Sequence, residues 1–120
     1  MKRVLTAALA AALLAGCGSG PTARATTGCA SAGPDTVAVA AALRQGRADP
    51  APHRVPVPLG SAVVLRVDAD TDAEVHVHGY DLTTAARPGS PGCVSFVAER
   101  SGLFDVEAHP ETLLVQLEVR

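Results

Sequence analysis

The chain has 120 residues, a formal net charge of −2 at pH 7, and only two Phe, one Tyr and no Trp. A charge this small predicts neither nucleic-acid binding nor a polybasic patch for anionic lipids. The sequence contains no Gly-rich phosphate or dinucleotide motif and no repeat of solenoid length. The length suits one domain rather than two.

The first segment, residues 1–16, has the pattern of a cleaved signal peptide. Two basic residues precede a mostly apolar stretch over residues 4–14, which is shorter than the roughly 20 residues that a membrane-spanning helix needs. Leu14-Ala15-Gly16-Cys17 then resembles the lipobox of bacterial lipoproteins. The resemblance implies a lipidated Cys17 and a location on the extracytoplasmic face of the cell membrane. An ordinary secretory signal and a buried core helix remain the alternatives.

Residues 17–34 are expected to form the lipidated N-terminus and a flexible tether. Residues 18–27 read GSGPTARATT, and such small and polar side chains cannot bury enough apolar surface to fold. The folded domain is therefore expected to occupy residues 35–120.

The two remaining cysteines, Cys29 and Cys93, form an even pair in an oxidising compartment. We predict a disulfide between them, closing a loop of about 64 residues and contributing at most about 4 kcal/mol in the chain-entropy description. Two free thiols are the alternative, and a third possibility is that Cys93 is a metal thiolate.

From residue 35 onward, apolar residues alternate with polar ones in short segments separated by turn residues, as in Val63, Leu65 and Val67. This pattern is typical of half-buried strands. About seven strands are expected, near residues 36–43, 54–58, 62–69, 73–78, 93–98, 102–108 and 112–119. They predict an all-β fold, an antiparallel sandwich or barrel. A helix near residues 36–44 is the local alternative, because this stretch is rich in alanine.

The segment from Glu74 to His78 places two histidines on one strand face. Residues two apart on a strand share a face, so His76 and His78 point away from Val75 and Val77. Two such imidazoles can converge on one metal ion. The alternative is that they are solvated polar residues of an outer face, as we expect for His53 in the Pro-rich stretch.

A second polar row follows near the end of the chain, formed by Asp105, Glu107 and His109. If the two strands are neighbours, His78 and His109 could meet. Imidazoles combined with a carboxylate suit Cu(II), Zn(II) or Ni(II), and the usual order of affinities favours copper.

Residues 55–120 resemble the cupredoxin-like domains of bacterial cell-envelope proteins. Three segments carry the resemblance: residues 57–65 (VPLGSAVVL), 77–82 (VHGYDL) and 101–106 (SGLFDV). The resemblance implies a Greek-key β-sandwich. It also implies that His78 corresponds to the first copper-ligating histidine of the family. The strand after residue 101 would then correspond to the family's strand that leads into the second loop of copper ligands.

The sequence departs from that family at the second ligand loop. Ala108 stands where the copper-ligating Cys is expected, His109 follows it, and no Met occurs after Met1. Without a thiolate there is no blue-copper site and no rapid redox couple of that kind. The resemblance then implies a colourless site of His78 and His109, with His76 and Glu107 as candidate third ligands, for storage or delivery of a metal.

Two further interpretations remain. The domain could be a metal-free interaction or accessory module of a cell-envelope complex. An enzyme is not expected, because no nucleophile elbow, Ser/His/Asp spacing or paired-carboxylate cleft is visible.

Overall fold

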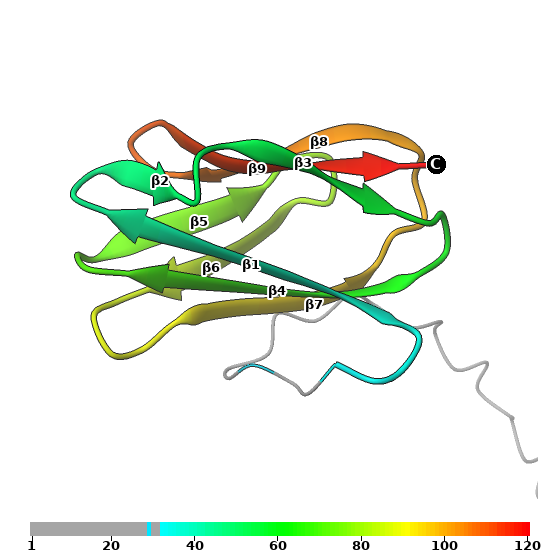
Figure 1. Cartoon of the computed structure of the whole chain (residues 1–120), viewed down its shortest axis with the longest axis horizontal. Coiled ribbons are helices and arrows are strands. Elements are labelled where there is room, and N and C mark those ends of the chain that lie inside the picture. The colour runs from blue at the N-terminus through cyan, green and yellow to red at the C-terminus, as the bar shows by residue number, and fades with distance from the viewer. Residues whose placement is uncertain (1–28, 30–31) are drawn as a thin grey trace, which may run out of the picture.

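The computed structural model describes Cys29 and residues 32–120, which form two β-sheets (Figure 1). The expected signal peptide, Cys17 and most of the expected tether lie outside these residues. Within the described part there is no helix long and apolar enough to cross a membrane.

Within residues 32–120, nine strands build the sandwich, in the chain order β1 (Thr36–Arg44), β2 (Arg47–Asp49), β3 (His53–Val57), β4 (Ala62–Ala69), β5 (Ala73–Val77), β6 (Leu82–Ala86), β7 (Gly92–Val97), β8 (Gly102–Ala108) and β9 (Thr112–Val119). One sheet has four strands in the order β2-β1-β4-β7. The other has five strands in the order β3-β9-β8-β5-β6.

All seven predicted strands are present, and the alanine-rich β1 is a strand rather than a helix. Its residues Val39, Ala41 and Leu43 are buried, while the residues between them lie on the outer side. Tertiary packing of this alternating face outweighs the helix propensity of alanine. The two strands that the sequence did not indicate are β2, which has three residues, and β6, whose sequence LTTAA does not alternate between apolar and polar residues.

The predicted β-sandwich is confirmed, and two of its strand pairs are parallel rather than antiparallel. β1 pairs with β4 in parallel, and β3 pairs with β9 in parallel. Parallel neighbours cannot be joined by a tight hairpin, so the chain must leave the sheet between them. It does so by running from β1 through β2 into β3 of the opposite sheet before it returns to β4.

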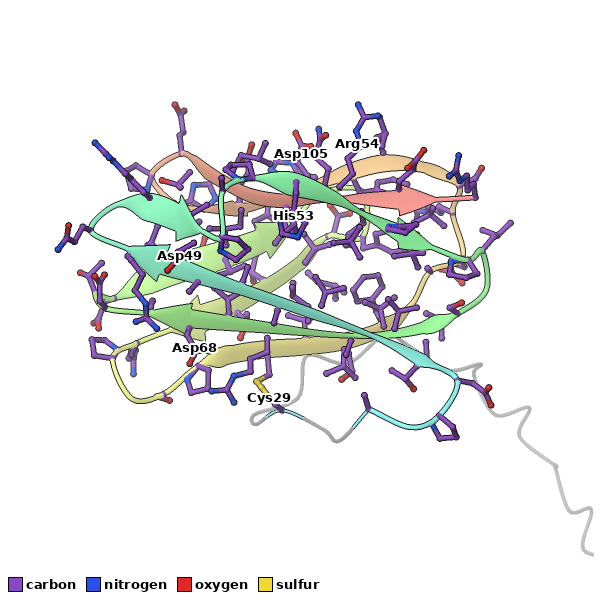
Figure 2. All side chains as sticks on the ribbon, in the orientation of Figure 1. Cys29, Asp49, His53, Arg54, Asp68 and Asp105 are labelled. Atoms are coloured by element: carbon purple, nitrogen blue, oxygen red, sulfur yellow. A yellow bond between two sulfur atoms is a disulfide. The ribbon has the colours of Figure 1, made fainter. Side chains whose placement is uncertain are left out.

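The core lies between the two sheets and is entirely apolar in the described part of the chain. Figure 2 shows the side chains that fill this space. Strand alternation supplies most of them, including the fully buried Leu65 and Leu117. A register shift between β8 and β9 leaves Leu114 unpaired, so Leu114 is buried and Leu113 is only half-buried. Alternation alone would have placed Leu113 inside.

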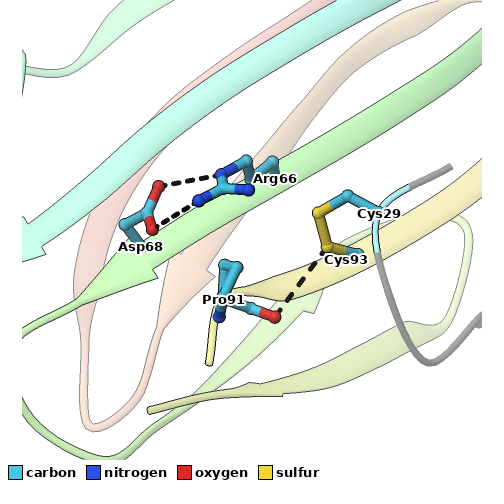
Figure 3. The surroundings of a disulfide bond; sticks show 5 residues. All are labelled: Cys29, Arg66, Asp68, Pro91 and Cys93. Atoms are coloured by element: carbon cyan, nitrogen blue, oxygen red, sulfur yellow. Dashed lines mark hydrogen bonds and ion pairs between the residues drawn. A yellow bond between two sulfur atoms is a disulfide. The ribbon is translucent and has the colours of Figure 1, made fainter. Parts of the chain in front are cut away.

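The predicted disulfide between Cys29 and Cys93 is confirmed, with the two Cα atoms 5.0 Å apart (Figure 3). Cys93 lies on the outer side of β7, opposite Arg66 of β4. The bond therefore fastens the segment before β1 to the outer face of the four-stranded sheet. Beside it, the Arg66 guanidinium donates two hydrogen bonds to Asp68, and these lower the pKa of that carboxyl.

Candidate functional site

The two polar rows that the sequence indicated lie side by side, because β5 and β8 are antiparallel neighbours in the five-stranded sheet. His76 lies opposite Glu107. The backbone N–H of His78 donates to the carbonyl of Asp105 at 2.9 Å, and that of His109 donates to the carbonyl of Glu74 at 2.8 Å. Each histidine thus lies across from an acidic residue. We call these six residues the histidine face: Glu74, His76, His78, Asp105, Glu107 and His109.

The histidine face is on the outer side of the sheet because the alternate residues are locked in the core. Val75, Val77, Val106 and Ala108 are all fully buried. This fixes the direction of their neighbours, as the alternation of the sequence predicts. The side chain of His78 is 45% exposed and that of Glu107 is 28% exposed, so the face is open to solvent.

His76 occupies the centre of the row of imidazoles. Its ring centre lies 4.3 Å from that of His78 and 6.3 Å from that of His109. His109 lies across from Glu74 in the antiparallel register, and Glu74 is four residues before His78. The backbones of His78 and His109 are therefore about 13 Å apart along the strand. The expected contact between His78 and His109 is therefore replaced by two contacts, each made by His76.

The carboxylates of the histidine face have different partners. Nε2 of His78 lies 2.9 Å from Oε2 of Glu107. Asp105 instead accepts a hydrogen bond of 2.8 Å from Nε2 of Gln116, whose own oxygen accepts one from Arg54 at 3.3 Å. Figure 2 shows Asp105 and Arg54 on the same side of the molecule.

In their present rotamers the side chains of the histidine face do not form a preorganised metal-binding site. Among Cys29 and residues 32–120, no group of three or more His, Cys, Asp or Glu side chains is placed to hold a metal ion. The chemistry of the donors nevertheless suits an ion such as Cu(II) or Zn(II), since imidazoles and carboxylates are adjacent.

A thiolate site of the blue-copper kind does not fit the described residues. Ala108, at the position expected for the copper-binding Cys, is fully buried in the core, whereas His78 lies on the opposite side of the sheet. The sulfur atoms of Cys29 and Cys93 are joined to each other. His78 and Ala108, the two positions that the resemblance assigns to the copper ligands, also lie at opposite ends of the β5–β8 pair.

The Gly79-Tyr80 pair after His78 has a structural role that the sequence did not reveal. Gly79 has a φ of 80°, and a Cβ atom there would collide with the ring of Phe104. The Tyr80 hydroxyl donates to the carbonyl of Arg100 at 2.9 Å and accepts from its backbone N–H at 3.2 Å. The Tyr80 ring packs against Phe96 and Phe104. This corner closes the end of the sandwich next to His78.

His53 lies elsewhere, as predicted. It is exposed, and its Nδ1 lies 3.0 Å from the carbonyl oxygen of Ala51, two residues earlier in the chain. It belongs to β3 and is not a member of the histidine face.

Comparison with known proteins identifies the fold. No protein-family model matches the sequence, and no curated protein does either. Among solved structures, the periplasmic domain of subunit II of cytochrome oxidase (CoxB) from Bradyrhizobium japonicum is similar, with a TM-score of 0.56, 15% identity, and coverage of 70% of this chain and 83% of that one.

The blue copper protein auracyanin A from Chloroflexus aurantiacus has a TM-score of 0.54 at 14% identity, with coverage of 71% of this chain and 99% of that one. The fold is a cupredoxin-like β-sandwich. A heme-copper terminal oxidase gives a TM-score of 0.53 at 20% identity, covering 83% of this chain and 78% of that one. Identities this low show a shared fold alone.

Proposed function

We propose that this protein is a lipid-anchored, extracytoplasmic lipoprotein whose cupredoxin-like domain binds copper or a similar divalent ion for storage or delivery. The observation that carries the proposal is the row of three imidazoles, with His76 4.3 Å and 6.3 Å from its two neighbours. In this proposal His76 is the central ligand, and His78 and His109 are its partners.

The ring separations suit a shared ion. Two imidazoles that each bind one ion at about 2.0 Å bring their ring centres to roughly 4.5–6 Å apart, depending on the angle at the metal. The two observed separations lie just outside the two ends of this range, so side-chain rotation must bring His76 and each neighbour into position for a shared ion. Because the face is open to solvent, water completes the coordination and the ion can exchange.

The compartment supports the same proposal. The Cys29–Cys93 disulfide is expected outside the cytoplasm, where such bonds persist. The lipobox-like segment supports a membrane anchor at Cys17. Copper is the first ion to test because the fold is shared with a blue copper protein. The missing thiolate favours a colourless site that binds Cu(II) without rapid electron transfer.

The test is a Cu(II) titration of the purified full-length chain, followed by calorimetry and electron paramagnetic resonance. We expect one equivalent of copper with nitrogen ligands and a spectrum without the blue-copper signature. The double variant His78→Ala with His109→Ala should lose stoichiometric binding, because only one imidazole of the row remains. Unchanged affinity in that variant would reject the proposed ligands.

A second candidate is a metal-free accessory module of a cell-envelope complex, and one observation favours it. Leu59, Val97 and Leu103 are about half exposed, at 54%, 49% and 49%. All three lie at one end of the sandwich, since Val97 pairs with Ala62 and Leu103 pairs with Glu118. The test is crosslinking in membranes, comparing the native chain with a Leu59→Asp/Leu103→Asp variant. A partner that crosslinks only to the native chain, in a protein that binds no copper, would support the accessory function.

A further inference from the structure

Glu107 has a single partner in the described part of the chain, and that partner is His78. Its Oε2 lies 2.9 Å from Nε2 of His78. Glu107 is also the less exposed of the two side chains, at 28% against 45%. The Glu107 carboxylate therefore differs from a fully solvated surface acid, because its contact with the His78 ring sets its position.

The contact determines which nitrogen of His78 carries the hydrogen. An ionised carboxylate can only accept, so Nε2 of His78 must be the donor. In the neutral imidazole the lone pair is then on Nδ1. Since a metal ion takes the unprotonated nitrogen, His78 can offer Nδ1 while its contact with Glu107 is kept.

The other acids of the histidine face do not make this contact with His78. Asp105 lies across from His78, but its Oδ1 is occupied by Gln116 at 2.8 Å. Glu74 is exposed and lies beside His109 at the other end of the face. Glu107, opposite His76 and diagonal to His78, is the carboxylate that reaches the His78 ring.

We propose that Glu107 is a positioning residue that holds the His78 ring with Nε2–H toward itself and presents Nδ1 to an ion shared with His76. This inference rests on the proposed function. Glu107 then acts through His78 and does not bind the ion, which differs from its sequence-based assignment as a candidate third ligand. Carboxylates that accept from the second nitrogen of a metal-binding histidine are a common means of orienting the ring.

Two substitutions separate a positioning residue from a ligand. In Glu107→Ala no group accepts from Nε2–H, and we expect the affinity for Cu(II) to fall about 10–100-fold. In Glu107→Gln the amide oxygen can still accept, so most of the affinity should return. A ligand carboxylate would behave differently, because an amide oxygen is a poor ligand for copper and both variants would then lose affinity equally. Glu118→Ala is the matched control, since Glu118 contacts Arg120.

The experiment combines nitrogen-15 NMR of the histidine rings in the metal-free, full-length chain with Cu(II) titration of the same samples. The expected result is a slowly exchanging Nε2–H of His78 in the native chain and in Glu107→Gln, lost in Glu107→Ala, with the affinities following the same order. Equal losses in both variants, or native affinity in Glu107→Ala, would overturn the inference alone. A native chain that shows the Nε2–H signal but binds no copper would instead reject the proposed function, and with it the role of Glu107 toward a metal.

Discussion

The outer faces of the two sheets differ in chemistry although both follow the same strand alternation. The outer side of the four-stranded sheet carries small side chains such as Ala38, Ala40 and Ala62, interrupted by the Arg66–Asp68 pair and the disulfide. The outer side of the five-stranded sheet carries three histidines and three carboxylates at the β5–β8 pair. Figures 2 and 3 show residues of both faces.

This difference separates two tasks within one small domain. The four-stranded sheet holds the covalent link to the N-terminal segment, whereas the five-stranded sheet presents the groups that can bind an ion. Changes on the first face should therefore alter stability without altering copper affinity. Changes within the histidine face should do the reverse.

The largest effect on stability is expected from loss of the disulfide. Cys93→Ser should lower the free energy of unfolding by up to about 4 kcal/mol, because a bond between residues 64 apart restricts the unfolded chain. Denaturant unfolding measures this loss. Cys29→Ser should have the same effect, and the double variant should be no less stable than either single one. A loss of copper affinity in these variants would show that the two faces are not independent.

The next largest effect is expected at Gly79. Gly79→Ala combines a positive φ of 80° with a collision against Phe104, and we expect a loss of about 1–3 kcal/mol or more. Gly60→Ala is the matched control, since Gly60 has a φ of 87° and open space around the added Cβ. Thermal unfolding of both variants isolates the contribution of the Phe104 contact. Equal losses would mean that the contact contributes nothing.

A smaller effect is expected when the Tyr80 hydroxyl is removed. Tyr80→Phe keeps the ring against Phe96 and Phe104 but loses the two hydrogen bonds to the Arg100 backbone. The expected loss is about 1 kcal/mol, measured by chemical unfolding. If the corner holds His78 in place only through ring packing, copper affinity will not change. A large loss of affinity would assign the hydroxyl a direct part in the site.

The smallest effect concerns the exposed Arg66–Asp68 pair. The hydrogen bonds from Arg66 lower the pKa of Asp68 in the folded chain, so the pair stabilises the fold above the ordinary carboxyl pKa. This contribution disappears as the pH falls through the lowered value. Asp68→Asn should therefore be slightly less stable than the native chain near pH 7, and the two should converge in acid. A constant difference between about pH 6 and pH 2 would contradict the assignment.

Strand alternation made much of the fold predictable. The residues of β4 and β8 alternate clearly, and their buried members are those that the sequence indicated. By contrast, β2 is too short to show a period, and the parallel pairing of β1 with β4 depends on a chain path through the other sheet. Neither could be read from local residues.

The candidate site was predictable in composition but not in arrangement. Alternation fixes the outward direction of His76 and His78, yet only the register of β5 against β8 shows that His76 is the central ring. The corner formed by Gly79 and Tyr80 depends on Phe104 and Arg100, which lie 20 or more residues later in the sequence. A motif that resembles a ligand segment is here also a structural corner.

The most direct test compares Cu(II) affinity in His76→Ala and His53→Ala, measured by competition titration of the full-length chain. Both variants remove one imidazole, but only His76 lies between two other histidines. We predict that His76→Ala weakens binding by more than about 100-fold, since losing a residue that only orients a metal ligand already costs about 10–100-fold. His53→Ala should bind as the native chain does. Equal affinities in the two variants would contradict the assignment of the histidine face as the metal site.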